Sequence, residues 1–229
     1  MLTVCPSIHP AITALAPGFR ALSIVVEAAP LRHAEVGAEA LKAACEGISA
    51  DSPAWAEAHL AAWGEVFKAF GAKPKRTPCS AEALRKRVLR DGALSAIDPV
   101  VDLYNAVSIK YAIPVGGENI AAYIGTPRLM VADGSESFDT IKEGEVVLET
   151  VDAGEAIWRD DKGVTCRRWN WRQGVRTRLD SSARQMWFIL ESLPAMPLDA
   201  LHAAGDELID GLQRMMPGAK IEKQLLNAL

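Results

Sequence analysis

The feature that restricts the fold most is a succession of short apolar segments in the second half of the chain. Turn residues separate each segment from the next, a pattern typical of the strands of an antiparallel sheet. Asp161, Lys162 and Gly163 predict a hairpin turn between two of them. The segments read RLMVADG, EVVLETV, EAIWRD, VTCRRWNW and MWFILES. Together they predict a mainly antiparallel sheet.

The first half of the chain shows mostly the spacing of helices. Phe19 to Glu27 is apolar and β-branched enough for a buried strand, and residues 31–45 continue as alanine-rich helical sequence. Ser52 and Pro53 form the pair expected at a helix start, with Ser52 as the N-cap. We expect that helix to stop at Gly71. Its predicted core side chains are Leu60, Trp63, Phe67 and Phe70.

Two more helices are predicted from their N-caps. Ser80 is the expected N-cap of one helix, and Asp98 with Pro99 repeats the N-cap and first-turn signal for the next. Gly116 and Gly117 are expected to form a tight turn after the second helix. The inward residues predicted for these two helices are Leu84, Val88, Val100, Leu103, Tyr104, Val107 and Tyr111.

Residues 197–216 return to helical spacing, with Leu201, Leu208, Leu212 and Met215 predicted to face inward. The sequence therefore predicts the α+β class, a mainly antiparallel sheet with flanking helices. It contains no repeat, low-complexity tract or obvious linker. We expect one domain over residues 1–229, with a strand and helices in 1–79 and a helical extension in 194–229.

Charge and cysteine usage argue against several classes of protein. The formal net charge of -4 is unlike that of a protein that coats DNA. The cysteines and histidines are scattered without the spacing of a zinc site, so we expect reduced cysteines, no metal and no cofactor. No apolar run approaches the ~20 residues of a membrane span, and the N-terminus lacks the pattern of a secretion signal. We expect a cytoplasmic protein without a membrane partner.

The segment from Cys166 to Leu179 reads CRRWNWRQGVRTRL and contains five arginines, two tryptophans and no acidic residue. One interpretation is a half-exposed strand whose arginines pair with acids such as Asp160, Asp161 or Asp180. The other is a pocket wall. There, tryptophan stacks on a base or a side chain, amides read polar edges, and arginine clamps a phosphate or carboxylate. For the segment as a cluster, the sequence favours the pocket wall.

A second charged segment lies between Lys73 and Arg90. A charge run of this kind is usually a solvated helix face, and the alternative is a docking surface for RNA phosphates. Its basic residues are Lys73, Lys75, Arg76, Arg85, Lys86, Arg87 and Arg90, of which the last four are expected mostly to face solvent. The sequence shows no nucleophile elbow, phosphate loop, metalloprotease or dinucleotide motif. Any chemistry is therefore expected to work by positioning.

Two strings resemble a known family. VVDLYNAVSIKYAIPVGGENI and GEAIWRDDKGVTCRRWNWRQGVRTRLDSSARQMWFILES are similar to freestanding proteins of the B3/B4 type. These proteins are related to the tRNA-editing domain of the phenylalanyl-tRNA synthetase β subunit. DLYNAVSIKY and RRWNWRQGVRT are the most characteristic parts, and the clearest resemblance covers residues 80–193. The resemblance implies the B3/B4 fold.

In the synthetase this domain hydrolyses tyrosine wrongly attached to the phenylalanine tRNA. The bacterial editing site has a glutamate that Glu191 matches, and a histidine in a turn where this chain has Gly116 or Gly117. The resemblance implies a pocket where the predicted helix around Asn105, that turn and the later strands converge. With the arginine-rich segment, it assigns to a ligand pocket Asn105, Gly116, Gly117, Arg168, Trp169, Asn170, Trp171, Arg172 and Gln173.

Two functions remain open. The first is a trans-acting hydrolase that removes a wrong amino acid from the 3′ end of tRNA, with water as nucleophile and Glu191 as the catalytic residue. The second is a non-catalytic module that binds tRNA or an aminoacylated small molecule. The missing histidine favours the second, and Glu191 in a dense polar pocket favours the first. A further alternative is that Glu191 merely pairs with Arg168 or Arg172 in a structural salt bridge. In either function the basic segment would bind tRNA.

Overall fold

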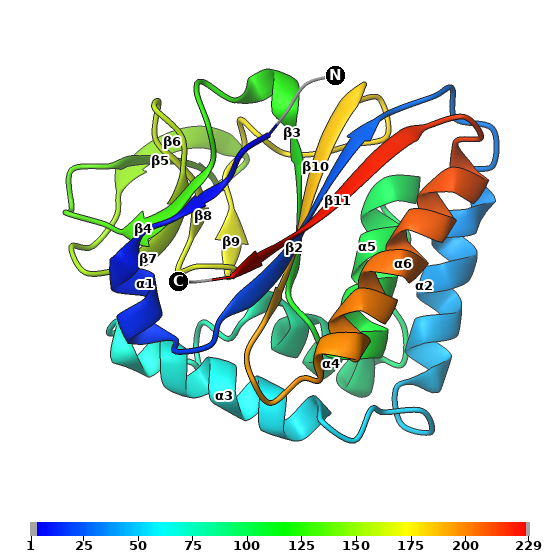
Figure 1. Ribbon diagram of the computed structural model, residues 1–229, viewed down its shortest axis with the longest axis horizontal. Helices are drawn as coiled ribbons and strands as arrows, with labels where there is room; N and C mark the ends of the chain where they lie inside the picture. Colours follow the sequence, from blue (N-terminus) through cyan, green and yellow to red (C-terminus); the bar gives the residue numbers. More distant parts are fainter. Residues whose placement is uncertain (1–3, 228–229) are drawn as a thin grey trace.

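Figure 1 shows the computed structural model, which describes residues 4–227. Two sheets lie side by side, and helices pack outside them, so the predicted α+β class is confirmed. A four-stranded sheet has the order β11-β2-β10-β3 and is antiparallel between every pair of neighbours. Its strands are β2 (Arg20–Glu27), β3 (Val115–Asn119), β10 (Gln185–Ser192) and β11 (Lys220–Asn227).

The second sheet has the order β1-β4-β7-β8-β5-β6, and β9 pairs with β8. Its neighbours are antiparallel except for β1 with β4 and β5 with β8, which are parallel. The predicted turn at 161–163 joins β7 to β8, and the Asp160 carboxylate accepts hydrogen bonds from two of its amides. The strands are β1 (Ser7–Ile8), β4 (Arg128–Val131), β5 (Ser137–Lys142), β6 (Glu145–Thr150), β7 (Ala156–Arg159), β8 (Val164–Arg167) and β9 (Arg172–Gln173).

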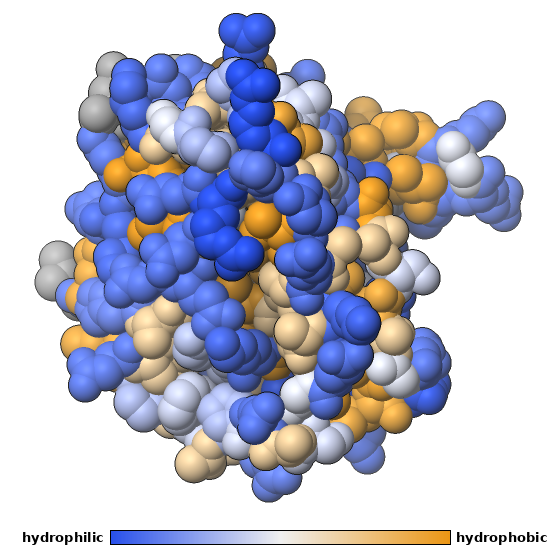
Figure 2. Space-filling view, turned by 90° about the vertical axis from the view of Figure 1, so that its right-hand side faces the viewer, coloured by the Kyte–Doolittle hydropathy of each residue, from blue (hydrophilic) through white to orange (hydrophobic). Residues whose placement is uncertain are grey.

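Helices α2, α5 and α6 cover one face of the four-stranded sheet, and α3 runs beneath both sheets (Figure 1). The outward side of α2 and α6 is largely hydrophilic, as expected for helices that bury one stripe (Figure 2). The four side chains of α6 that were predicted to face inward are fully buried. The helices are α1 (Pro10–Leu15), α2 (Glu35–Gly47), α3 (Ala56–Ala69), α4 (Ser80–Asp91), α5 (Pro99–Tyr111) and α6 (Leu198–Met215), with a short 3-10 turn at Ile120–Ala122.

Strand β10 separates two hydrophobic cores because its side chains alternate between the faces of the sheet. Phe188 and Leu190 pack toward α6 with the apolar residues of β2. Trp187 and Ile189 point the other way, toward α3 and the second sheet. Glu191 continues this second set by the same alternation. A carboxylate is therefore delivered into the space between the two sheets.

Three predicted boundaries differ from the structure. α3 begins at Ala56 rather than beside Ser52, and the Ser52 hydroxyl instead accepts a hydrogen bond from Arg85. Gly116 and Gly117 do not form a tight turn but lie inside β3, because α5 already reverses direction at Ala112, which has a φ of 49°. The predicted helical extension of residues 194–229 also contains β11, which completes the sheet. By contrast, Asp98 caps α5 as predicted, accepting from two backbone amides.

A buried histidine joins α3 to the ends of α5 and β10. His59 donates from Nδ1 to the Ala112 carbonyl at 2.8 Å, and its Nε2 accepts from the Leu193 amide at 3.1 Å. Burial lowers the pKa of His59 to about 4. The neutral ring thus fixes the chain directly after the strand that carries Glu191.

We expect His59 to make the protein less stable in mild acid. Since its pKa is lower in the folded than in the unfolded chain, its contribution is full above pH 6.5 and falls as the pH drops to about 4. The loss should be about 3 kcal/mol of unfolding free energy. Urea unfolding of wild type and His59→Gln at pH 7 and pH 4 measures it. A pH dependence that is equal in the two proteins would contradict this assignment.

Candidate functional site

A cavity of about 270 Å³ lies between the two sheets, beside the start of α4 and one side of α5. Its half-buried residues form a rim and its buried residues a floor. The lining residues are Ser80, Ala83, Leu84, Tyr104, Asn105, Val115, Gly116, Gly117, Glu118, Trp158, Cys166, Trp169, Asn170, Trp171, Gln173, Trp187, Ile189 and Glu191. The structure thus brings together Glu191 and seven of the nine residues that the sequence assigned to a ligand pocket.

One wall of the cavity is the face of the four-stranded sheet described above. Glu118 of β3 is the cross-strand partner of Trp187, and Gly116 that of Ile189, so these four residues share this face. A Cβ atom on Gly116 would lie 3.2 Å from the Ile189 side chain, which leaves little room for a larger residue. The two strands therefore bring two carboxylates, Glu118 and Glu191, to one side of the cavity.

The opposite wall is a row across β7, β8 and β9. Trp158 pairs with Cys166, and Cys166 pairs with Gln173. The Gln173 side-chain amide donates to the Gly117 carbonyl at 2.6 Å and so ties the two walls together. Arg167 and Arg172 are the next cross-strand pair and, by alternation, face away from the cavity.

The predicted strand VTCRRWNW ends at Arg167, and a tight turn follows it. Arg168 and Trp169 have left-handed backbones with φ of 46° and 64°. The Glu155 carboxylate holds this turn by accepting from the Arg168 amide at 2.8 Å and from the Arg167 guanidinium at 2.8 and 3.0 Å. The turn reverses the chain. Trp169 is buried in the core and also lines the cavity, as do Asn170 and Trp171.

Glu191 is the most highly connected residue of the cavity floor. Its Oε1 accepts from the Trp158 and Trp169 indole nitrogens at 2.8 and 2.9 Å, and its Oε2 accepts from the Asn170 side-chain amide at 3.0 Å. The residue is 1% exposed. Burial raises the pKa of Glu191 to about 7, although the three donors partly offset this effect. The predicted pairing with Arg168 or Arg172 is therefore wrong, because neutral N–H groups occupy the carboxylate.

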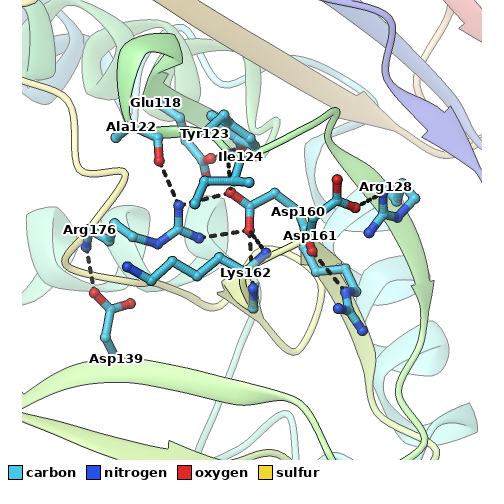
Figure 3. A network of polar contacts seen from close by, with 12 residues as sticks. Glu118, Ala122, Tyr123, Ile124, Arg128, Asp139, Asp160, Asp161, Lys162 and Arg176 are labelled. Carbon is cyan, nitrogen blue, oxygen red and sulfur yellow. Dashed lines mark hydrogen bonds and ion pairs between the residues drawn. The ribbon is translucent and has the colours of Figure 1, made fainter.

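Glu118 is a second buried carboxyl group that the sequence analysis missed. It accepts a hydrogen bond from the Tyr123 hydroxyl, close to the Asp160–Arg176 pair that joins the neighbouring loops (Figure 3). Burial raises the pKa of Glu118 to about 8, and the polar groups of Thr165, Gln173 and Thr177 partly offset the rise. The only sequence sign of this site was an acidic residue two positions after Gly116, which places both residues on the same face of a strand.

Two of the predicted pocket arginines do not line the cavity. Arg168 lies near Glu155 and stacks its guanidinium on the Trp171 ring at 4.7 Å. Arg172 covers the same ring at 4.6 Å. They lie outside because the chain turns at 168–171 instead of continuing as a strand. The two cations support Trp171 and are not placed to clamp an anion inside the cavity.

The prediction that Arg85 faces solvent is also wrong. This residue is 8% exposed and donates to the Ile109 carbonyl at 2.5 Å and to the Ser52 hydroxyl at 2.7 Å. These bonds join α4 to α5 and to the start of α3. The other basic residues of the segment, Lys73, Lys75, Arg76, Lys86, Arg87 and Arg90, are exposed.

The structure gives little support for a cysteine nucleophile or a metal site. Burial raises the pKa of the Cys166 thiol well above its usual range, so this residue is a poor nucleophile. Over residues 4–227, no group of three or more histidine, cysteine, aspartate and glutamate residues is placed to hold a metal ion. Over the same range, no helix is long and apolar enough to cross a membrane.

Comparison with known proteins gives a match to a family model and matches to solved structures. A family model described as the B3/4 domain matches residues 62–198. The N-terminal fragment of the phenylalanyl-tRNA synthetase β-subunit from Pyrococcus horikoshii is similar with a TM-score of 0.48 and 11% sequence identity. The match covers 98% of this chain and 54% of that fragment, so the chain spans about half of its length. A search of the curated proteins gave no match.

Proposed function

The chain belongs to the B3/4 domain family, and we propose that it is a trans-acting editing protein that hydrolyses the ester of a mischarged tRNA. The environment of the Glu191 carboxyl group is the observation that supports this proposal most strongly. A carboxyl group with a pKa of about 7 lines a cavity and accepts a single protein hydrogen bond on its Oε2. A group with such a pKa takes up and releases a proton near neutral pH, as a general base must.

In the proposed reaction, ionised Glu191 takes a proton from a water molecule held at its Oε2. The water oxygen forms a bond to the carbonyl carbon of the aminoacyl ester. The bond from that carbon to the ribose oxygen of the terminal adenosine then breaks, and the ribose oxygen receives a proton. The products are a free amino acid and tRNA. The protein contributes orientation of the ester and the water, without a covalent intermediate.

The cavity rim supports a tRNA 3′ end as the ligand. Ser80, Ala83 and Leu84 belong to the first turns of α4 and lie on the rim. The same helix carries exposed Arg87 and Arg90 toward its other end. A phosphate backbone bound along α4 would therefore lead its terminal nucleotide to the cavity.

We expect the exposed basic residues around α4 to bind tRNA. Reversal of Lys75, Arg76 and Arg87 to glutamate should lower tRNA affinity at least about tenfold at low salt and flatten the salt dependence, because fewer counterions are released. Filter binding over a range of salt concentrations measures both. The matched control reverses three exposed cations outside this region, Arg32, Lys42 and Lys220. Equal losses in the two proteins would place the docking surface elsewhere.

A second function, a non-catalytic module that binds tRNA or an aminoacylated small molecule, is favoured by two observations. Three N–H donors already occupy acceptor positions of the Glu191 carboxylate, which leaves fewer lone pairs free to take a proton from water. The place where bacterial editing sites carry a histidine is occupied by Gly116 and Gly117 of β3. Deacylation assays with purified protein separate the two functions.

A further inference from the structure

The charges that line the cavity are of one sign. Glu118 and Glu191 are both lining residues, and no lysine, arginine or histidine is among the lining residues of the described chain. Neither carboxylate takes part in any ion pair within residues 4–227. Buried carboxyl groups are normally paired with cations or take up a proton, because an unpaired buried charge is costly.

A third acceptor lies at the same place. The Asn170 side-chain amide donates to Glu191, and the carbonyl oxygen Oδ1 of Asn170 is buried without a hydrogen-bond partner among residues 4–227. Asn170 is 7% exposed and lines the cavity. A buried polar atom without a partner needs an explanation, and a donor supplied by a ligand is the simplest one for an acceptor on a cavity wall.

The remaining walls suit an organic cation. The indole rings of Trp158, Trp169, Trp171 and Trp187 line the cavity together with the Tyr104 ring. Aromatic faces attract ammonium and guanidinium groups, and the attraction is strongest where water is excluded. Aromatic rings, two carboxylates and a free carbonyl oxygen form a set that repels phosphate and carboxylate ligands.

We propose that the cavity binds a positively charged group of its ligand, an ammonium or guanidinium, through Glu191, Glu118 and the Asn170 carbonyl oxygen. The proposal deepens the proposed function and rests on the same cavity. Two parts of an aminoacyl ester carry such a group. One is the α-ammonium that every aminoacyl ester has, and the other is the side chain of a basic amino acid. The experiment distinguishes them.

Titration calorimetry of the wild-type protein with four small probes tests the proposal. Norleucine amide carries only the α-ammonium, Nα-acetyl-lysine amide only the side-chain ammonium, Nα-acetyl-norleucine amide is neutral, and AMP is an anion. At least one cationic amide should bind at least about tenfold more tightly than the neutral amide and AMP. Equal binding of the neutral amide or of AMP overturns the proposal. Absence of binding by both cationic amides also overturns it.

Proton release gives a second test that needs no variant. A cation favours ionised carboxylates, so its binding near pH 7 should expel protons from Glu191 and Glu118, whose raised pKa values lie in that range. Tyr104, Cys166 and Cys79 also lie near the cavity, and burial raises their pKa values, so they stay protonated. Tyr123 donates its hydroxyl to Glu118, and Arg176 acts on Glu118 electrostatically. Calorimetry in two buffers of different ionisation enthalpy measures the release. Binding without proton release would contradict ionic recognition.

Single substitutions test whether each carboxylate contributes to cation binding. Glu191→Gln and Glu118→Gln should each weaken binding of the cationic amide at least about tenfold, or ~1.4 kcal/mol, while Glu39→Gln on exposed α2 should leave it unchanged. Binding that is unaffected by both cavity variants overturns the proposal. Because no probe contains tRNA or a scissile ester, the outcome is independent of hydrolysis. Deacylation without cation binding leaves the proposed function standing, and cation binding without deacylation leaves this proposal standing.

Discussion

A Glu191→Gln protein is expected to hydrolyse its mischarged tRNA at least about tenfold more slowly than wild type in a single turnover, a loss of ~1.4 kcal/mol of barrier stabilisation. The amide has almost the shape of the carboxyl group but accepts no proton from water. Its oxygen keeps the two indole N–H donors, and its nitrogen faces the unpartnered Asn170 Oδ1 once that side chain flips. The fold should therefore persist.

Alanine is a poor test at this position. Glu191→Ala would leave the N–H groups of Trp158, Trp169 and Asn170 buried without an acceptor. Each unsatisfied donor costs about 1–3 kcal/mol, so a loss of activity would be mixed with unfolding. The controls for Glu191→Gln are an unchanged melting temperature, an unchanged affinity for uncharged tRNA and insensitivity to chelators. Deacylation at the wild-type rate in a folded Glu191→Gln protein would rule Glu191 out as the base.

The rate should also depend on pH in one direction. Burial raises the pKa of Glu191 to about 7, and the ionised form is the base. The single-turnover rate of wild type, measured with the protein below its Kd for the substrate, reports the free protein and is therefore expected to rise as the pH increases through 7 and then to level off. The raised pKa also means that folding becomes less favourable as the pH rises from about 4.5, the ordinary value, to about 7, because the folded protein binds this proton more tightly than the unfolded chain over that range. Activity and stability thus change in opposite directions at this residue.

Trp63→Ala is expected to lower the free energy of unfolding by about 3–5 kcal/mol. The ring is fully buried and contacts Phe19, Phe67 and Trp169 edge to face, with centroids 6.3, 6.4 and 5.3 Å away. Its indole nitrogen has no hydrogen-bond partner, so the loss is one of packing. Because Trp169 also donates to Glu191, the substitution should disturb the cavity as well.

Trp171→Ala is the matched control, since it removes the same side chain from the half-buried cavity rim. The Trp171 ring packs only partly against the core and is covered by the Arg168 and Arg172 guanidinium groups. We expect a cost below about 1 kcal/mol. Urea unfolding of both variants makes the comparison. If both variants lose about 3–5 kcal/mol of unfolding free energy, Trp171 is a core residue; if both lose less than about 1 kcal/mol, Trp63 does not stabilise the core.

The sequence predicted those elements correctly that depend on neighbouring residues alone. The short apolar segment MWFILES predicted β10, and Asp98 with Pro99 predicted the start of α5, because strand segments and helix caps are set by neighbouring residues. It failed at 168–171, where the chain turns through two left-handed residues that Glu155 stabilises from 12 or more positions away in the sequence. No local pattern contains that contact. The strand prediction therefore continued through the turn and placed Arg168 and Arg172 on the cavity.

Pairing between distant segments limited the prediction of the site in the same way. Glu118 became a candidate once the β3–β10 register placed it opposite Trp187. Arg85 was expected in solvent because helical spacing on α4 does not show that α5 and Ser52 supply two acceptors. Asn105, Asn170, Gln173 and Glu191 were assigned to the site from the arginine-rich segment and the B3/B4 resemblance, and the structure places all four on the cavity lining. The contacts that these side chains make could be identified only from the folded structure.

The most direct measurement is deacylation of a panel of correctly and wrongly charged tRNAs by the purified protein, compared with spontaneous hydrolysis. We predict that at least one mischarged tRNA loses its amino acid faster with wild-type protein, and that Glu191→Gln removes at least about 90% of this acceleration. Hydrolysis of every tRNA at the spontaneous rate would contradict the editing function. So would an acceleration that the Glu191→Gln protein retains in full.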